Sequence, residues 1–274
     1  MAAGKTIVVT GASSGIGAYC ARALRRDGWR VFATARRRED IAGLEADGIE
    51  AFFLDYRDPA SIAQFATDVL ARTGGTLDAL FNNGGQSQIG AVEDLPVDAL
   101  REQFEVNLFG VHDLTRRLVP AMRAQGHGRI VNCSSMLGLA PVKWRGAYSA
   151  SKHALEALTL TLRAELSGSG IHVCLIEPGL IETRVGANSL PLLEQNVDWK
   201  TSVHRETYEK LIAGLKTGGR RSRMRKGPEA VHRALDHALT STSPRPHYPV
   251  TPAAWIVVVA RRLLPSRLYY RLLT

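Results

Sequence analysis

The sequence has few cysteines, no recognisable secretory leader and no long hydrophobic run. Its only cysteines, Cys20, Cys133 and Cys174, lie in apolar or helical settings without the spacing of metal ligands. We therefore expect buried free thiols in a reducing compartment, and no metal site. Residues 1–5 lack the charged, apolar and cleavage regions of a signal peptide, so the sequence predicts an intracellular, cytoplasmic protein.

The C-terminal segment 252–274 is apolar but interrupted by arginines. The apolar run 255–260 ends at two arginines and is far below the roughly twenty residues that span a bilayer, which excludes a transmembrane helix there. The pattern predicts a C-terminal amphipathic helical segment. Two interpretations stay open: the segment packs on its own domain or on a second subunit, or it makes peripheral membrane contact with its arginines snorkelling.

Acidic residues are fewer than basic ones, 26 against 35, which leaves a net charge of +9. The basic residues concentrate in segments 216–226 and 261–271. The first of these contains no aromatic residue on which a base could stack, so the composition predicts no specific nucleic-acid partner. A solvated loop is the simpler interpretation of 216–226, with a site for an acidic partner as the alternative.

Short apolar runs alternate with helical patterns along most of the 274 residues. Six runs read as strands buried on both faces, joined by segments long enough for helical crossovers. We therefore predict a single domain over 1–274, an α/β fold with a doubly wound, Rossmann-type parallel sheet and helices on both faces. The predicted strands are 7–9, 31–33, 51–54, 77–81, 130–133 and 171–176.

Two long helices are predicted over 96–124 and 147–166. In the second, Leu155, Leu158, Leu162 and Leu166 are spaced to cover one face, which indicates core packing. The segment 186–227 follows the sixth strand and becomes polar and charged. Because ligands bind at the carboxyl ends of strands in such sheets, we predict that 186–227 is a lid over the substrate.

A glycine-rich turn directly follows the first predicted strand. Three glycines in seven residues between a strand and a helix allow backbone N–H groups to approach an anion, and the helix N-terminus adds positive charge. The turn predicts a site for a dinucleotide pyrophosphate. The same residues also fit the Gly-x-Ser-x-Gly elbow of serine hydrolases with Ser13 as nucleophile, although about ten preceding residues are too few for the oxyanion loop. The residues of the turn are Gly11, Ser13, Ser14, Gly15, Ile16 and Gly17.

The second predicted strand ends in arginines rather than in an acidic residue. A site for NAD(H) usually places Asp or Glu there to hold the ribose 2′-hydroxyl. Arg36, with help from Arg37 or Arg38, instead matches a 2′-phosphate and predicts NADP(H) as the cofactor. A solvated basic helix start is the alternative.

Tyr148 and Lys152 are one helical turn apart, so their side chains share a face. A nearby ammonium group favours the ionised phenol, and we expect Lys152 to draw the pKa of Tyr148 down towards neutrality. Tyr148 could then pass a proton. Ser135 lies thirteen residues before Tyr148, after the fifth strand.

Taken together, these motifs resemble the short-chain dehydrogenase/reductase family over about residues 5–185. The resemblance rests on the glycine turn, Asn82-Asn83-Gly84-Gly85, Asn107, Ser135, the Tyr148/Lys152 pair and Pro178-Gly179. It implies that Ser135 binds the substrate carbonyl, Tyr148 donates the proton, and Lys152 binds the nicotinamide ribose. Asn107 would hold a water that relays protons through Lys152.

The resemblance also implies further cofactor contacts. Asp55, beside the amide of Tyr56, would accept from the adenine, and Asn83 and Gly84 would flank the adenosine ribose. The nicotinamide and diphosphate would be held by Pro178, Gly179, Ile181 and Thr183. The family's usual Asn-Asn-Ala-Gly reads Asn-Asn-Gly-Gly here, and loss of the methyl group is expected to loosen this turn.

The sequence is most similar to the branch with 17β-hydroxysteroid dehydrogenases, retinol dehydrogenases and bacterial NADP-dependent aldehyde reductases. That similarity implies a hydrophobic aldehyde, ketone or alcohol as substrate, with Leu137, Val142 and Trp144 as apolar contacts. A homodimer or homotetramer is implied by likeness alone. Two alternatives to the oxidoreductase are a cofactor-binding regulator or scaffold without turnover and, less favoured, the serine hydrolase.

Overall fold

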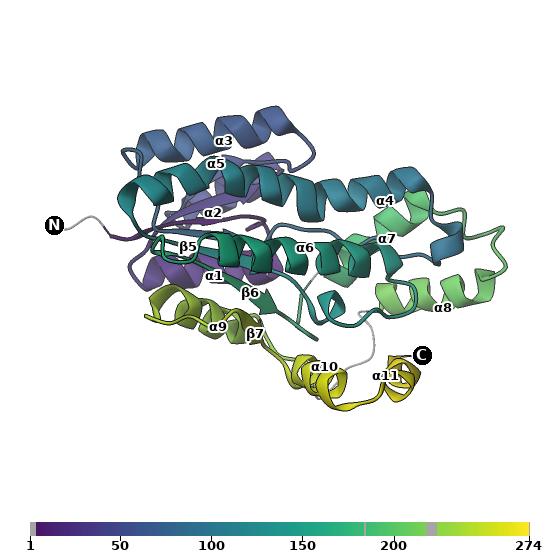
Figure 1. The fold of residues 1–274 in the computed structure, drawn as a ribbon. Helices are drawn as coiled ribbons and strands as arrows, with labels where there is room; N and C mark the ends of the chain where they lie inside the picture. The colour runs from purple at the N-terminus through teal and green to yellow at the C-terminus, as the bar shows by residue number, and fades with distance from the viewer. Residues whose placement is uncertain (1–3, 184, 218–223, 274) are drawn as a thin grey trace.

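The computed structural model describes residues 4–183, 185–217 and 224–273. Seven strands form one parallel sheet in the order β3-β2-β1-β4-β5-β6-β7 (Figure 1), which confirms the doubly wound α/β prediction. Six strands match the predicted runs to within two residues at each end. The strands are β1 (Thr6–Val9), β2 (Arg30–Ala35), β3 (Glu50–Phe53), β4 (Ala79–Asn82), β5 (Gly128–Cys133), β6 (Ile171–Glu177) and β7 (His247–Pro249).

The seventh strand was not predicted. β7 has three residues, one of them Pro249, and its register places His247 opposite Leu175 at the sheet edge. Proline has no backbone N–H to donate to a ladder, so within sheets it is tolerated on an edge strand such as this. A run this short has no periodicity that sequence analysis could use.

Helices cover both faces of the sheet (Figure 1). The apolar residues of each layer form a separate buried cluster against one face. Strands such as β1, whose four residues are all buried, contribute side chains alternately to the two clusters. The first layer contains α1 (Gly15–Arg26), α2 (Arg38–Ala46) and α9 (Glu229–Thr240); the second contains α3 (Pro59–Arg72), α4 (Val97–Phe104), α5 (Gly110–Gln125) and α6 (Gly146–Glu165).

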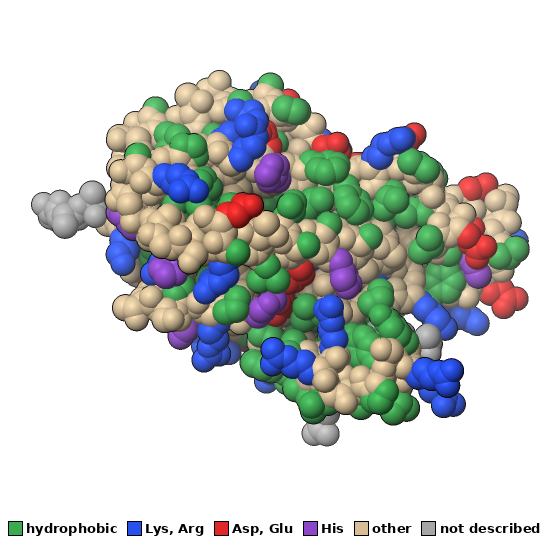
Figure 2. Space-filling model, in the orientation of Figure 1, with side chains coloured by type: hydrophobic (Ala, Val, Ile, Leu, Met, Phe, Trp, Pro, Cys, Tyr) green, Lys and Arg blue, Asp and Glu red, His purple; other side chains and the backbone are tan. Residues whose placement is uncertain are grey.

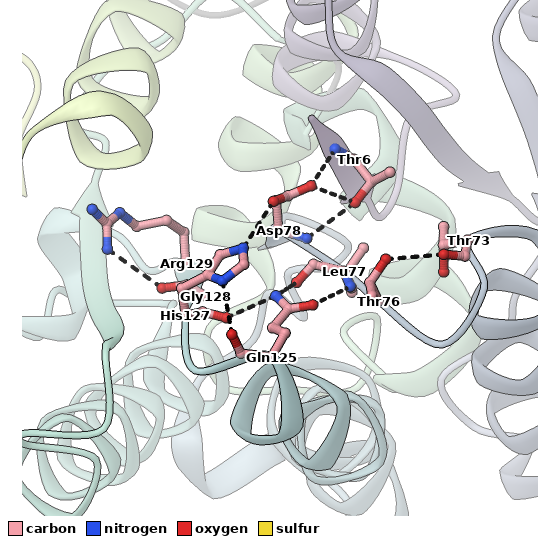
Figure 3. Close-up of polar contacts among 9 residues, drawn as sticks. All are labelled: Thr6, Thr73, Thr76, Leu77, Asp78, Gln125, His127, Gly128 and Arg129. Carbon is pink, nitrogen blue, oxygen red and sulfur yellow. Dashed lines mark hydrogen bonds and ion pairs between the residues drawn. The ribbon is translucent and has the colours of Figure 1, made fainter. Parts of the chain in front are cut away.

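The amino ends of the central strands are tied together by a polar network (Figure 3). Asp78 accepts hydrogen bonds from the amide and hydroxyl of Thr6, at 2.7 and 2.8 Å, and lies 3.2 Å from Nε2 of His127. Gln125 donates to the carbonyl oxygens of Leu77 and His127 and accepts from the Leu77 amide. This end of the sheet is closed by side chains, and the opposite, carboxyl end holds the cleft.

The long helix predicted over 96–124 is interrupted by a π-helical turn, η2 (Glu105–Phe109), between α4 and α5. Asn107 lies inside it and is fully buried. A π turn inserts one residue into the helix and often marks a functional site. The prediction of a core leucine stripe on α6 is wrong at one position, because Leu158 is 45% exposed while Leu155 and Leu166 are buried.

The predicted lid contains two helices, α7 (Val185–Asn196) and α8 (Arg205–Lys216). They enclose a cluster of their own in which Leu193, Val197 and Tyr208 pack against Ile89 and Ala91. The Tyr208 hydroxyl accepts from the Ala91 amide at 2.8 Å and donates to Asp94 at 2.9 Å. Within the predicted lid and the basic run 216–226, residues 218–223 lie outside the described part of the chain.

The C-terminal segment forms α10 (Pro252–Leu263) and α11 (Ser266–Leu273), which extend from the lower edge of the body in Figure 1. Thr251 caps α10 by accepting from the Ala254 amide at 3.3 Å. Among the helices of residues 4–183, 185–217 and 224–273, none has the length and apolarity required to cross a membrane.

Candidate active site

The cleft lies where the strand order reverses, between β1 and β4. In doubly wound sheets, adjacent crossovers run to opposite faces at this point and leave a crevice at the carboxyl ends of the strands. A cavity of about 860 Å³ opens there, bounded at one end by the glycine turn and at the other by residues of α8. The elements that line it come from most of the chain, from Thr10 to Arg225.

The glycine turn forms a cradle into which no side chain would fit. Gly11 and Gly15 have φ angles of 65° and 58°, in the left-handed region that favours glycine. A Cβ atom at Gly11 would lie 2.6 Å from the Cα of Gly84, and one at Gly17 would collide with the carbonyl oxygen of Gly11. Ser14 precedes α1 as its N-cap, so the amides of the first helical turn face the cleft. The cradle therefore fits a dinucleotide pyrophosphate.

The turn after β4 holds the glycine turn in place. Asn83 donates from Nδ2 to the carbonyl oxygens of Thr10 and Gly11, at 3.1 and 3.2 Å. The Thr10 hydroxyl accepts from the amides of Asn83 and Gly84 and from the Tyr56 hydroxyl. A methyl group at Gly84 would lie only 2.9 Å from the Tyr56 ring. The Tyr56 ring therefore occupies the space that a methyl group at Gly84 would need, and the expected loosening of this turn stays a prediction.

The arginines after β2 differ in their surroundings. Arg36 is exposed and lines the cleft, whereas Arg37 forms a bidentate ion pair with Asp40, with N–O distances of 2.7 and 2.9 Å, and is not among the lining residues. Asp55 also lines the cleft. Partial burial opposes its ionisation, but hydrogen bonds from Arg57 and the charge of Arg36 outweigh burial and lower the pKa of Asp55. Among the described residues, Arg36 forms no ion pair like that of Arg37, and its guanidinium acts on Asp55 only through its charge.

Ser135, Tyr148 and Lys152 meet at the carboxyl end of β5 and line the cleft together. The Ser135 Oγ accepts from the Leu137 amide at 3.1 Å, which fixes the side chain at the start of the short helix η3 (Met136–Gly138). The Lys152 ammonium group is buried; it donates to the Cys133 carbonyl at 2.8 Å and lies 5.8 Å from the centre of the Tyr148 ring. These contacts come from β5 and α6, so the sheet sets their geometry.

The pKa of Tyr148 moves in the direction opposite to our expectation. Burial raises it to about 12, with a smaller contribution from Cys133, and a hydrogen bond with Ser135 and the charge of Arg145 only partly offset the rise. Burial also lowers the pKa of Lys152. The predicted depression by Lys152 is therefore wrong here, because desolvation of the Tyr148 phenol outweighs the groups that lower its pKa. Tyr148 keeps its proton at neutral pH.

Asn107 clamps the chain next to Lys152. Its Nδ2 donates to the Gln86 carbonyl at 2.9 Å and to the Ser151 hydroxyl at 3.1 Å, and its Oδ1 accepts from the Gln86 amide at 2.9 Å. A Cβ at Gly85 would lie 3.1 Å from the Asn107 Oδ1 and 3.8 Å from the Lys152 Nζ. The π turn thus brings Asn107 to the edge of the Tyr148–Lys152 pair.

Pro178, Gly179, Ile181 and Thr183 follow β6 and line the cleft opposite the glycine turn. The Thr183 side chain lies 3.3 Å from the position of a Cβ on Gly15. Leu180 and Glu182 exchange backbone hydrogen bonds with Lys226, at 3.0 and 2.9 Å. This bridge ties the far end of the predicted lid to the predicted cofactor loop.

Leu137, Val142 and Trp144 form an apolar end of the cleft. Trp144 has a φ of 68° and is the one non-glycine residue in the described ranges with a positive φ. Its carbonyl accepts from the Gly90 amide at 3.1 Å, and its ring packs edge-on against His204 and Tyr208, with centroids 5.1 and 5.7 Å apart. A left-handed tryptophan costs about 1–3 kcal/mol, which these contacts offset.

Sequence reasoning missed two groups of residues. Lys210, Leu211 and Leu215 on α8 line the cleft, but the sequence signals only an amphipathic helix there. Glu156, Glu177 and His247 form a second, buried cluster behind Lys152, with their nearest ligating atoms within 4.8 Å of one another. The sequence signal available for this cluster was the helical spacing of Glu156 from Lys152. No local sequence pattern indicates that β6 and β7 lie side by side.

A phosphate cradle at the switch point of a parallel sheet, next to a partly buried tyrosine and a buried lysine, is typical of a nicotinamide-dependent oxidoreductase. The chain belongs to the short-chain dehydrogenase family, whose model, described as short chain dehydrogenase, matches residues 5–191. Membership of this oxidoreductase family decides against the hydrolase that would use Ser13.

The similarity extends over nearly the whole chain. The chain is 39% identical over 269 residues to the uncharacterized oxidoreductase YbbO of Escherichia coli (strain K12), covering 98% of this chain and 94% of that one. A variant of the actinorhodin polyketide ketoreductase, solved with NADPH, matches with a TM-score of 0.72, 30% identity and coverage of 90% and 95%. A short chain dehydrogenase/reductase from Burkholderia phymatum, solved with NAD, matches with a TM-score of 0.80, 25% identity and coverage of 95% and 92%. These neighbours hold either form of the nicotinamide cofactor.

Proposed function

We propose that this protein is an NADP(H)-dependent oxidoreductase that interconverts a hydrophobic aldehyde or ketone and its alcohol. The observation that carries the proposal is the shared cleft, in which Ser135, Tyr148 and Lys152 stand at the carboxyl end of β5 beside the glycine cradle. The substrate types that we propose are steroid, retinoid and long-chain carbonyl compounds. In this proposal the bound nicotinamide supplies or accepts the hydride.

The chain's own residues hold and move the proton. The Ser135 oxygen already accepts from the Leu137 amide, so its O–H remains able to donate to a substrate carbonyl oxygen. Burial keeps the Tyr148 phenol protonated at neutral pH, ready to protonate that oxygen in the reducing direction. The Lys152 ammonium and the Ser135 hydroxyl would stabilise the negative charge that develops.

Arg36 supports the choice of NADP(H), whereas Asp55 is placed to bind the adenine that both cofactors share. In this proposal the exposed guanidinium of Arg36 binds the 2′-phosphate, and Asp55 accepts from the adenine amino group. Pro178, Gly179 and Thr183 would hold the nicotinamide side. Arg37 contributes less, because Asp40 already engages it.

The apolar end of the cleft supports a hydrophobic substrate. Leu137, Val142 and Trp144 line it from one side, and Leu211 and Leu215 of α8 from the other. We assign the segment 186–227 the role of a lid on this basis. The three buried free cysteines support a reducing compartment, the cytoplasm.

The proposal is tested by cofactor oxidation with a panel of long-chain aldehydes, retinal, keto-steroids and small ketones, using NADPH and NADH in parallel and titrating the binding of both. Turnover with NADPH on the apolar carbonyl compounds is the expected result. Tight NADPH binding without turnover on the whole panel would favour the regulator or scaffold instead. Turnover confined to small polar ketones would refute the assigned substrate class.

We further propose that two copies pair through α5 and α6. Leu158 on α6 and Phe109 next to α5 are 45% and 51% exposed, and a shallow groove runs between the two helices, lined by Leu108, Val111 and Leu162 among others. Hydrophobic side chains lie along this face in Figure 2. Apolar groups exposed on two helices are covered when the helices of two copies pack together.

Leu158→Glu is expected to turn the dimer into a monomer in light-scattering measurements, because it would bury a charge in that contact. Val203→Glu, at a site that is 88% exposed and distant in sequence, is the control and should leave the mass unchanged. A Leu158→Glu protein with the mass of the unaltered protein would contradict this pairing.

A further inference from the structure

The C-terminal helices α10 and α11 carry a large apolar surface that the rest of the described chain leaves uncovered. Figure 2 shows hydrophobic side chains gathered over these helices, with Lys and Arg side chains around them. Among the side chains described for the two helices, only those of Ala254 and Tyr269 are buried. The exposed members are Trp255 (49%), Ile256 (59%), Val259 (48%), Leu263 (75%), Leu268 (52%) and Tyr270 (55%). An apolar surface of this kind marks a contact with a partner or a membrane.

The charge of this surface favours an anionic partner. Segment 252–273 contains four arginines and no acidic residue. A second copy would bring the same positive charges face to face, which costs free energy. Arginine stems can instead lie along apolar groups while their guanidinium heads reach phosphate, and tryptophan and tyrosine favour the interface between lipid and water.

The apolar surface is attached to the wall of the cleft. Arg261 and the Tyr269 hydroxyl both donate to the Leu139 carbonyl, at 3.3 and 3.2 Å. Leu139 directly follows η3, and Leu137 within η3 lies at the apolar end of the cleft. A surface that covered α10 and α11 would therefore lie next to the proposed substrate site.

We propose that α10 and α11 are an interfacial anchor that binds an anionic lipid bilayer. The exposed apolar side chains enter the boundary between headgroups and acyl chains, and the exposed guanidinium groups of Arg262 and Arg267 bind lipid phosphates. The anchor itself does not depend on the reaction. Its consequence, delivery of a lipophilic carbonyl compound from the bilayer to the cleft, rests on the proposed function.

The test is flotation of the full-length protein with vesicles of phosphatidylcholine alone or with phosphatidylglycerol. We expect binding to the mixed vesicles and a loss of roughly tenfold or more in partitioning for Trp255→Ser/Ile256→Ser, because two half-exposed apolar groups lose their lipid contact. Val92→Ser/Val203→Ser removes two apolar side chains that are 76% and 88% exposed elsewhere, and should bind like the unaltered protein.

Three outcomes would overturn the anchor. One is absence of binding to the mixed vesicles. Another is equal binding by Trp255→Ser/Ile256→Ser and the unaltered protein, which would reduce the contact to surface charge. The third is a change of oligomeric mass with this variant and no lipid binding, which would assign the surface to a second copy. Because no assay here uses turnover, failure of the proposed function would not affect the result.

A second, independent feature is the buried acidic pair behind Lys152. Glu177, the last residue of β6, is fully buried, and Glu156 on α6 is 7% exposed. His247 of β7 lies within hydrogen-bonding distance of Glu177, with its Nδ1 2.5 Å from Oε1, and 3.8 Å from Glu156 Oε2. Two carboxylates so close in a dry site cannot both ionise easily, so the pair retains a proton.

The environment of Glu156 sets which carboxyl keeps that proton. Burial and the neighbouring Glu177 raise the pKa of Glu156 to about 8, while His247 and Lys152 act in the other direction. The hydrogen bond that His247 donates to Glu177 raises the pKa of His247. The charged and titratable groups acting within the cluster are Lys152 and Arg163 on α6, Glu177 on β6, His247 on β7 and Cys133 on β5.

Glu156 is linked to the reaction centre through Lys152. The two residues are one turn apart on α6, and the hydrogen bond of the Lys152 ammonium goes to a neutral carbonyl. When Glu156 is ionised, it therefore places a negative charge next to a buried cation and favours the charged form of Lys152. Glu156 also lies near Ser134. A Cβ atom placed on Gly138 would be 2.6 Å from the Ser134 Oγ and 3.2 Å from the Glu156 Oε1, so both side chains border the same glycine.

We infer that Glu156 is a positioning residue that holds Lys152 in its charged form once the Glu156 carboxyl group is ionised. This inference rests on the proposed function, in which Lys152 must remain an ammonium group. When solvent becomes alkaline, Glu156 ionises and its charge compensates the growing tendency of Lys152 to lose its proton.

Glu156→Gln keeps the volume and removes the charge. We expect the alkaline limb of the pH–rate profile to move by about one pH unit towards neutrality, because Lys152 loses its anionic neighbour. Glu45→Gln, at an exposed position on α2, is the control and should leave the profile in place. An unmoved alkaline limb in Glu156→Gln would overturn the inference.

A measurement of unfolding against pH tests the acidic pair without turnover. Because the pKa of Glu156 is raised in the folded state, its protonated form stabilises the fold below about pH 4.5, and this contribution is lost as pH rises to about 8. The unfolding midpoint of the unaltered protein should fall across that window more than that of Glu156→Gln. Should Glu156→Gln not fold, His247→Gln should extend the fall to higher pH. An equal change of the unfolding midpoint with pH in the unaltered protein and the variant would contradict the raised pKa of Glu156. This holds whether or not the protein turns over a carbonyl compound.

Discussion

Tyr148→Phe should abolish turnover while NADPH binding stays nearly unchanged. The substitution removes the one phenolic proton next to Ser135, and general acid catalysis is typically worth about 10²–10⁴ in rate. The phenyl ring remains in place 5.8 Å from the Lys152 ammonium, so the shape of the cleft is kept. We expect kcat to fall by at least about 10²-fold and the NADPH Kd to change by less than about tenfold, or 1.4 kcal/mol.

The matched control is Tyr270→Phe, which removes a hydroxyl from a side chain that is 55% exposed on α11. It should retain full activity. Steady-state kinetics and a fluorescence titration of NADPH on the same preparations separate chemistry from binding. Near-normal activity of Tyr148→Phe would remove Tyr148 from the proton transfer, and a parallel loss of NADPH binding would assign it a structural role instead.

Arg36→Ala should weaken NADPH binding far more than NADH binding. A hydrogen bond between a guanidinium and a phosphate is worth about 1.5–3 kcal/mol, or roughly 10–150-fold in Kd. NADH has no 2′-phosphate, so its binding does not depend on this hydrogen bond. Arg36 lines the cleft next to Asp55, whose charge would repel an unaccompanied phosphate. The ratio of the two dissociation constants, measured by titration, is the quantity to compare.

Arg37→Ala provides a close control, since it removes the same side chain one residue along. Asp40 already engages Arg37 through two hydrogen bonds outside the cleft, so this variant should change the ratio by only a few-fold. A loss of equal size for both cofactors in Arg36→Ala would take Arg36 out of the 2′-phosphate site. A larger effect from Arg37 than from Arg36 would transfer the role to Arg37.

The strands and the cleft were predictable because their determinants are local in sequence. β1 and β5 are short runs of mainly buried residues. The turn after β1 needs glycine because its backbone has positive φ angles at Gly11 and Gly15. The clustering of Ser135, Tyr148 and Lys152 follows from helical spacing and from the meeting of strand ends at one edge of a sheet.

The remaining features depend on contacts between distant segments. The pKa of Tyr148 depends on how deeply α6 buries it, which no spacing reveals. β7 is too short to carry a period, and the cluster that it completes with Glu156 and Glu177 exists only in three dimensions. Leu158 is a similar case: its spacing matches that of core leucines, but within the described ranges its side chain stays 45% exposed.

The left-handed backbone at Trp144 limits how the cleft can be redesigned. Glycine would relieve the conformation there, yet it would also delete the ring on which His204 and Tyr208 rest. A smaller side chain that enlarged the cleft for bulkier compounds would keep the backbone cost and lose the packing that offsets it. A substitution of Trp144 that alters the substrate range is therefore expected to loosen the packing of α8 as well. Library selections for new substrates should recover compensating changes in α8 rather than single substitutions of Trp144.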